Sequence, residues 1–248
     1  MLNFCPIASS SNGNLYTLED GESKILIECG LPIKGIKRAL GFGLSEISFC
    51  LLSHAHADHS KAAKDIMKAG LDIYTSQGTI DALGLVGHRA HAIQAGVQFT
   101  SGNWIVMPVE AQHDAPEPLA FLIANRRSGE KILFATDTFY LKNRFVGLDV
   151  IAIECNHSYD ILNANVANGS LPAVQKERLM RSHMSLENLK EFLRANDLSR
   201  LREVHLLHLS EGNSGAAKFK REIQELTGKP TYIAAEHRKE LNAWRVMN

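Results

Sequence analysis

Features that mark several common protein classes are missing from this sequence of 248 residues. Cysteine is scarce, and the four thiols, Cys5, Cys29, Cys50 and Cys155, are scattered without a C-x-x-C pair. This pattern favours reduced, buried thiols in a cytoplasmic protein over a disulfide framework. The first residues also lack a basic segment followed by an apolar one, so we expect no secretory signal.

Long apolar runs and an excess of charge are missing as well. No apolar segment approaches the length that crosses a membrane, so we expect no membrane among the partners of this chain. Its 27 basic and 27 acidic residues cancel, and no global basic field would attract long nucleic acid, although a local patch remains open. The hydrophobic fraction of 45% is ordinary for a globular protein, and the length suits one large α/β domain or two small ones.

The sequence does contain a dense group of metal-ligating side chains between residues 53 and 60. Three imidazoles and one carboxylate fall within six positions, as His54, His56, Asp58 and His59. Neutral imidazole is the commonest metal ligand in proteins, so a chance histidine-rich loop is the weaker interpretation.

This group lies where a buried strand meets a helix. Residues 47–52 are apolar and predict the strand, and residues 59–69 predict the helix. Ligands bind at the carboxyl ends of strands in open α/β sheets. Because side chains two apart in an extended segment point the same way, the first two histidines should reach one metal, while Asp58 and His59 turn toward a second.

Other acids and histidines recur where apolar strands end. We expect strands over residues 1–7, 14–19, 24–28, 71–74, 97–100, 104–110, 119–124, 131–134, 149–154, 203–208, 232–234 and 241–246. The polar side chains that end or follow them include Glu28, His113, Asp137, Glu154, His157 and His208. This recurrence favours one shared site over a series of unrelated helix caps.

Helices are expected between these strands, which gives a mixed α/β chain. Their ranges are 33–40, 77–83, 172–181, 186–193 and 216–226. Ser76 and Ser185 are the expected N-caps, and Gly228 ends the last helix. His183 lies just before the second cap, where a helix amino terminus favours anions, so it is well placed to meet a phosphate. The small polar residues 8–14 could line an anionic substrate with backbone amides, but their spacing favours an ordinary hairpin loop.

Taken together, these residues carry a family resemblance. The chain resembles a metallo-β-lactamase-fold hydrolase through, in order, His54, His56, Asp58, His59, His113, Asp137 and His208. Within that superfamily it is most similar to the YycJ-type nucleases, through residues 10–14, 113–118, 135–138, 154–157, 182–185 and 208–210. The resemblance covers nearly the whole chain and implies a single domain over residues 1–248, folded as a four-layer αββα sandwich with metals at one edge. One departure is Glu28, where the family usually has aspartate, and the longer side chain is expected to shift the groups that orient the ligands.

The resemblance also implies a pair of divalent metal ions. The first would be held by His54, His56 and His113, and the second by Asp58, His59 and His208, with Asp137 shared between them. True β-lactamases of the family place a cysteine where this chain has Asp137, whose two oxygens can bridge two ions. Two ions about 3.5–4 Å apart can clamp a phosphoryl group for in-line attack. Nitrogen and oxygen ligands suit both Zn²⁺ and Mn²⁺.

Phosphodiester hydrolysis is therefore the leading hypothesis, by a nuclease of the exonuclease type that acts on DNA or RNA. His183 is the preferred phosphate contact, and His183, His157 or Asp58 would supply the proton for the leaving oxygen. A longer strand needs a track for several phosphates, for which the candidates are Lys176, Arg178, Arg181 and Arg144.

Two alternatives stay open. The zero net charge and the lack of a separate clamping domain leave room for hydrolysis of small cyclic nucleotides. An alternative from another class is a metal-containing binding protein without turnover. A closed structural site needs only four ligands, however, and seven candidates exceed that need.

Two histidines near the end of one expected strand compete for the same site. His205 and His208 are three positions apart, so on a strand they would point to opposite faces. We expect His208 to face the metals because it ends the strand beside a polar turn. His205 is then expected to be a structural residue.

Overall fold

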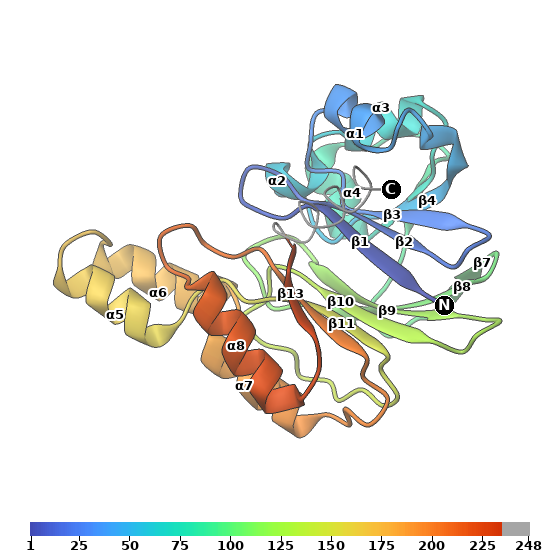
Figure 1. Cartoon of the computed structure of the whole chain (residues 1–248). Helices are drawn as coiled ribbons and strands as arrows, with labels where there is room; N and C mark the ends of the chain where they lie inside the picture. Colours follow the sequence, from blue (N-terminus) through green and yellow to red (C-terminus); the bar gives the residue numbers. More distant parts are fainter. Residues whose placement is uncertain (235–248) are drawn as a thin grey trace.

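The computed structural model describes residues 1–234, which form two β-sheets packed face to face with helices on both outer faces (Figure 1). The expected strand over residues 241–246 lies outside the described residues. None of the helices in the described part of the chain is long and apolar enough to cross a membrane.

The first sheet has six strands in sequence order. They are β1 (Asn3–Ala8), β2 (Leu15–Glu19), β3 (Lys24–Ile27), β4 (Ile47–Leu51), β5 (Ile73–Thr75) and β6 (Ala90–Ala92). The first three strands pair antiparallel, and β3 to β6 pair parallel. Its helical segments are α1 (Ile33–Ala39), a 3₁₀ turn (Leu44–Glu46), α2 (Ala57–Ser60), α3 (Ala63–Lys68) and α4 (Gln77–Leu83).

The second sheet has seven strands in reverse order, from β13 to β7. They are β7 (Phe99–Ser101), β8 (Trp104–Glu110), β9 (Leu119–Asn125), β10 (Lys131–Ala135), β11 (Val150–Glu154), β12 (Glu203–Leu207) and β13 (Thr231–Ile233). Strands β7 to β10 pair antiparallel, and β10 to β13 pair parallel. Its helices are α5 (Tyr159–Ala167), α6 (Ala173–Ser182), α7 (Leu186–Ala195) and α8 (Ala216–Thr227). Figure 1 shows α7 and α8 lying along this sheet, while α5 and α6 project to one side.

The alternation of side chains along the strands produces four layers. In β4, Phe49 and Leu51 join the apolar core between the sheets, and Cys50 faces the core beneath the helices. In β10, Phe134 faces the other sheet, whereas Leu133 packs toward α7 and α8. The central strands β10, β11 and β12 are buried on both faces, which explains why these parallel strands are almost continuously apolar. The predicted αββα sandwich is confirmed.

One helix predicted from the sequence is broken in the structure by long-range backbone hydrogen bonds. The segment 59–69 was expected to be continuous, but α2 and α3 are separate. The carbonyl of Asp58 accepts from the Asn14 amide at 2.7 Å, and the Ala62 amide donates to Cys29 at 2.9 Å. These partners replace the i to i+4 bond between Asp58 and Ala62, and so tie the metal-ligand motif to the first hairpin.

Two further differences concern elements that the sequence did not predict. Helix α5 and strand β6 are both absent from the elements expected from the sequence. The predicted caps are confirmed at α4 and α7, where Ser76 and Ser185 accept backbone amides of Thr79 and Asn188.

The parallel strands bring their carboxyl ends to one edge of the sandwich. Glu28 follows β3, Asp137 follows β10, and His208 follows β12. All three adopt left-handed backbone conformations, with φ of 64°, 40° and 49°. Such conformations cost about 1–3 kcal/mol each for residues with side chains, and they concentrate at functional sites. This edge is therefore where the structure concentrates backbone strain.

Substitution of Gly30 would test how closely the backbone segments pack at this edge. A Cβ at Gly30 would lie 1.6 Å from the Asp58 carbonyl oxygen, so we expect Gly30→Ala to destabilise the protein by about 3 kcal/mol. Gly35→Ala, within α1, would meet only a Leu31 carbon at 3.9 Å and should stabilise by about 0.5–1 kcal/mol. Denaturant unfolding measures both changes, and equal stabilities of the two variants would contradict this packing.

Candidate dinuclear metal site

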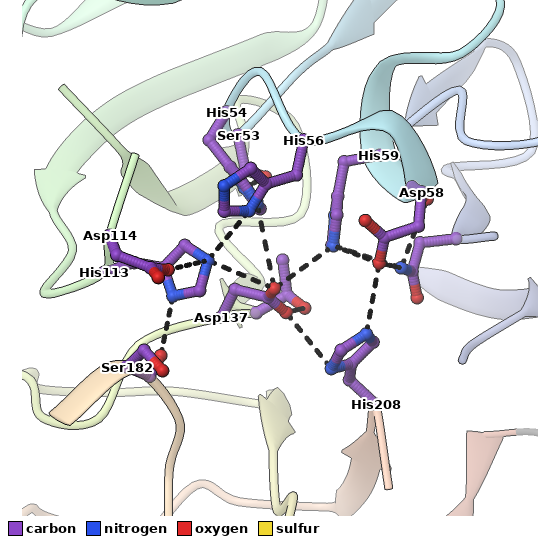
Figure 2. Close-up of polar contacts among 12 residues, drawn as sticks. Ser53, His54, His56, Asp58, His59, His113, Asp114, Asp137, Ser182 and His208 are labelled. Atoms are coloured by element: carbon purple, nitrogen blue, oxygen red, sulfur yellow. Dashed lines mark hydrogen bonds and ion pairs between the residues drawn. The ribbon is translucent and has the colours of Figure 1, made fainter. Parts of the chain in front are cut away.

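The structure brings the predicted ligands together at the strand-end edge (Figure 2). Asp137 lies in the middle of the cluster, with three histidines on one side and two histidines and Asp58 on the other. Three groups of four side chains each gather ligand atoms within 4.8 Å of one another, and all three include Asp137. One of them combines Asp137 and His208 with Glu154 and His183. The other two consist entirely of predicted metal ligands. Their members are His54, His56, His113 and Asp137, and Asp58, His59, Asp137 and His208.

In the first group, three imidazole nitrogens converge. Nδ1 of His56 lies 3.1 Å from Nε2 of His54 and 3.1 Å from Nε2 of His113. An Asp137 oxygen lies 3.8 Å and 3.5 Å from those two Nε2 atoms. A neutral imidazole has one N–H for two nitrogens, so each of the three rings can turn a nitrogen with an unshared electron pair toward a common point. That arrangement suits a cation.

In the second group, Asp58 and Asp137 flank two further imidazoles. Nε2 of His59 lies 3.3 Å from an Asp58 oxygen and 3.4 Å from an Asp137 oxygen. The His208 ring lies between the same carboxylates, with Nε2 3.3 Å from Asp58 and Nδ1 3.3 Å from Asp137. The group thus offers two nitrogens and two carboxylates, and Asp137 is common to both groups.

The outer nitrogens of the histidines are held by protein groups. Nδ1 of His113 donates to the Ser182 carbonyl at 2.7 Å, and Nδ1 of His54 lies 2.8 Å from the Ser53 hydroxyl. Histidines that bind metals usually make such a bond with the other ring nitrogen, which fixes the tautomer and the ring orientation. These residues therefore fit the pair of divalent ions that the family resemblance implies.

The charges inside the cluster balance one another. Burial lowers the pKa of the His208 imidazole, but the charge of Asp137 and hydrogen bonds to neighbouring carboxylates outweigh it, so the pKa rises to about 10. Burial likewise opposes ionisation of Asp137, yet the surrounding imidazoles hold its pKa well below the usual range. Metal ligands bind in their deprotonated form, so a divalent cation would displace protons from this cluster.

Glu154 supports the cluster from behind. One oxygen accepts from Nδ1 of His183 at 2.7 Å and lies 3.3 Å from Nδ1 of His208, and the other accepts the amides of Thr138 and Met184 at 3.0 Å each. The carboxylate therefore joins three separate segments at the site. The sequence placed an acid at this strand end but did not assign its partners.

The three residues predicted to handle protons differ in their access to solvent. The side chain of His183 is 16% exposed and that of Asp58 is 22% exposed, so both reach the surface of the cluster. His157 is completely buried and is absent from the groups that could hold a metal. Burial lowers its pKa to about 4, and within residues 1–234 neither ring nitrogen has a hydrogen-bond partner. The structure thus corrects the expectation for His157, because a buried neutral ring cannot pass a proton to an arriving substrate.

A buried hydrogen-bond network behind the second group was not anticipated from the sequence. Nδ2 of Asn14 donates to the Asp58 carbonyl at 3.2 Å and lies 3.1 Å from Nε2 of His59. Oδ1 of Asn14 accepts a hydrogen bond from the Tyr16 hydroxyl at 3.1 Å. The Tyr16 hydroxyl in turn lies 2.7 Å from the Ser9 hydroxyl, which accepts the backbone amide of His208 at 2.9 Å. The turn over residues 8–14 was expected to be an ordinary loop, and instead its flanks contact three of the four residues of this group, Asp58 and His208 through the backbone and His59 through the ring. The available signal in the sequence was the family resemblance of residues 10–14.

Glu28 occupies a similar supporting position behind His59. It is fully buried, one oxygen accepts the Ser53 amide at 3.3 Å, and the other lies 3.5 Å from Nδ1 of His59. Burial raises the pKa of Glu28 despite the neighbouring imidazole. The glutamate, which is longer than the aspartate usual in the family, therefore still approaches the ring of His59, at 3.5 Å.

The basic residues expected along a phosphate track are not equivalent. Arg178 donates twice to one Asp114 oxygen, at 3.0 and 2.8 Å, and Lys176 donates to Asn163 at 2.5 Å. The side chain of Arg181 has no such bond or ion pair among the described residues, and it lines cavities on both sides of α6. Of these three, Arg181 is the cation left available beside the cluster.

Comparison with known proteins gives consistent results. The model of the beta-lactamase superfamily domain matches residues 23–208. The exodeoxyribonuclease WalJ of Streptococcus pneumoniae is 28% identical over 84% of this chain and 81% of its own length. The exodeoxyribonuclease YycJ of Bacillus anthracis is 26% identical over 86% and 84%. The metallo-beta-lactamase fold protein YhfI from Bacillus subtilis superimposes with a TM-score of 0.71 at 17% identity, covering 94% of this chain and 96% of its own.

The two histidines near the end of β12 should behave differently when they are removed. His205 packs against Phe4 and Tyr232 in the core, with ring centroids 5.0 and 5.2 Å away, whereas His208 lies in the cluster. We expect His208→Ala to weaken binding of one of two metal ions, and His205→Ala to affect stability alone. Metal analysis of the dialysed proteins would decide, and loss of metal from the His205 variant with retention in the His208 variant would contradict this placement.

Asn14 should influence the same group through its hydrogen bonds. We expect Asn14→Ala to weaken the binding of the ion at the second group by about 10–100-fold, as is typical when a group that orients ligands is lost. The ion at the first group should be retained. Asn12→Ala, in the same turn but exposed, is the matched control. Calorimetric titration with Zn²⁺ measures both sites, and an unchanged titration for the Asn14 variant would show that the network does not orient the ligands.

Proposed function

Because the chain belongs to the beta-lactamase superfamily, we propose that it is a dinuclear metal-dependent phosphodiesterase, and specifically an exonuclease-type nuclease that acts on DNA or RNA. The predicted resemblance to this superfamily is confirmed by the match over residues 23–208. The broader prediction of a metal-dependent hydrolase is also confirmed, since the curated relatives are named exodeoxyribonucleases.

The observation that carries the proposal is the shared carboxylate of Asp137. It belongs to every one of the four-residue groups, and all their members offer nitrogen or oxygen atoms. Phosphoryl-transfer sites use two ions about 3.5–4 Å apart, and a carboxylate with two oxygens can serve both. This geometry supports the assignment of His54, His56 and His113 to one ion, and of Asp58, His59 and His208 to the other.

The pair of ions, Zn²⁺ or Mn²⁺, would supply Lewis-acid polarisation of the phosphoryl group and an activated water. The protein residues would hold and orient the other groups. Asp137, buried to 97% of its surface, keeps its charge inside the cluster because imidazoles surround it. The Ser53, Ser182 and Glu154 contacts keep the imidazole rings from turning.

His183 is the proposed phosphate contact and the preferred proton donor to the leaving oxygen. Its Nδ1 is tied to Glu154 at 2.7 Å, which leaves Nε2 as the nitrogen available to a substrate. Its ring lies 5.1 Å from the His113 ring and 5.7 Å from the His208 ring, so it lies beside both groups. Asp58, which also reaches solvent, is the second candidate for proton transfer.

Substitution of Asp137 tests the dinuclear scheme. We expect Asp137→Ala to lose at least one bound ion and to lower phosphodiester hydrolysis by several orders of magnitude, because both groups lose their common ligand. Asp114→Ala, an exposed acid beside His113 that is absent from the groups, is the matched control and should retain both ions.

The assay should offer single-stranded DNA, RNA and a cyclic nucleotide in parallel, with added Mn²⁺ or Zn²⁺. Release of mononucleotides from the polymers supports the proposed exonuclease. Hydrolysis of the cyclic nucleotide alone would replace it with the small-substrate alternative. Full activity of a metal-replete Asp137→Ala protein would refute the shared-ligand scheme.

A further inference from the structure

A large cavity adjoins the first group of ligands. Its volume is about 840 Å³, and its wall includes His113 and Asp114 from the β8–β9 connection. The wall also includes further residues of β8, β9 and their connection, the start of α4, residues 92–95 at the end of β6, Phe139 and Arg181. Small-molecule sites typically measure about 300–1,000 Å³, so this cavity has the size of a ligand site.

The charges in the wall disfavour a phosphate over most of its interior. Three carboxylates line it, from Glu110, Asp114 and Glu117, of which Glu110 is paired with Lys142 and Asp114 with Arg178. Arg181 is the one arginine or lysine among the lining residues. A backbone amide at the amino terminus of α4 is already bonded within the protein, because the Glu117 carboxylate accepts the Gly78 amide at 2.7 Å. An anionic group entering the cavity would therefore be best accommodated beside Arg181.

The same wall suits a flat, uncharged heterocycle. Ile93 and the Phe139 ring provide apolar surface, and an aromatic ring can stack on any nucleobase. Gln94 and Gln112 add amide groups that can bond to the edge of a base. A base placed here would have its phosphate near His113, the residue that links the cavity to the metal cluster.

Arg181 is positioned to hold that phosphate. It lies in α6 directly before Ser182, whose carbonyl accepts Nδ1 of His113 at 2.7 Å. The neighbouring Arg178 is occupied by Asp114, whereas Arg181 makes no hydrogen bond or ion pair within residues 1–234. The helix thus offers one uncommitted guanidinium at the junction of cavity and cluster.

We propose that this cavity is a nucleoside subsite, which takes the base and sugar next to the scissile bond while Arg181 contacts the adjoining phosphate; this rests on the proposed phosphodiesterase function. A base can enter such a cavity only after it leaves the helical stack, which costs least at a single-stranded or frayed end. The subsite therefore makes an unpaired strand end the substrate of this protein.

Binding of small ligands tests the subsite without any turnover. Thymidine and deoxyadenosine should bind the full-length protein as purified, as followed by calorimetry or NMR titration. Ala92→Phe, which fills the cavity wall, should weaken both at least tenfold. Val97→Phe is the control. Val97 lies between β6 and β7, is 56% exposed and does not line the cavity.

The phosphate contact is tested with thymidine monophosphate. Arg181→Ala should weaken binding of the monophosphate at least fivefold more than binding of thymidine. Arg194→Ala, which removes the same charge from the outer helix α7, should leave both affinities unchanged. Undetectable nucleoside binding, or equal binding by wild type and Ala92→Phe, would overturn the subsite. Equal losses for thymidine and its phosphate in the Arg181 variant would overturn the assigned phosphate contact.

Cleavage separates this inference from the proposed function. With metal added, the wild type should degrade a single strand at least tenfold faster than the same strand in a blunt duplex, and Ala92→Phe should reduce that ratio. Equal rates on both substrates would overturn the subsite while leaving the nuclease function intact. Nucleoside binding without hydrolysis of any phosphodiester would refute the proposed function and leave a nucleoside-binding cavity.

Discussion

The buried carboxylate of Asp137 is the constraint on which the rest of the site depends. Its oxygens lie within 3.3–3.8 Å of imidazole nitrogens from His54, His59, His113 and His208, which come from both sheets. A buried charge is costly unless it is paired and hydrogen-bonded, so the four rings must be delivered together. The strand ends, the left-handed residues and the supporting carboxylates can all be understood as means of holding these rings around one anion.

The dense motif at residues 53–60 and the apolar strands could be predicted because both are local patterns. An apolar run fixes a buried strand, and the polar residue after it then lies at a sheet edge whatever the rest of the chain does. That reasoning identified Asp137 and His208 as site candidates, and the family resemblance supplied the αββα layers, which periodicity alone does not specify.

The remaining features depend on partners far apart in the sequence. Asn14 reads as one residue of a polar turn, and its contact with Asp58 spans 44 positions. The break between α2 and α3 arises from backbone bonds to the first hairpin, whereas helix propensity reports only on neighbours. The sequence presents His157 as another strand-end ligand, whereas in the structure it is buried and pairs with Ser185, the N-cap of α7, 28 positions away.

The spread of the cluster along the chain has a consequence for synthesis. Its ligands extend from His54 to His208, so a ribosome must release more than four-fifths of the chain before the last imidazole can join. The first group of ligands is complete once Asp137 has been made, whereas the second waits for His208. A product truncated between these two residues would therefore keep the side chains of the first group and lack the second.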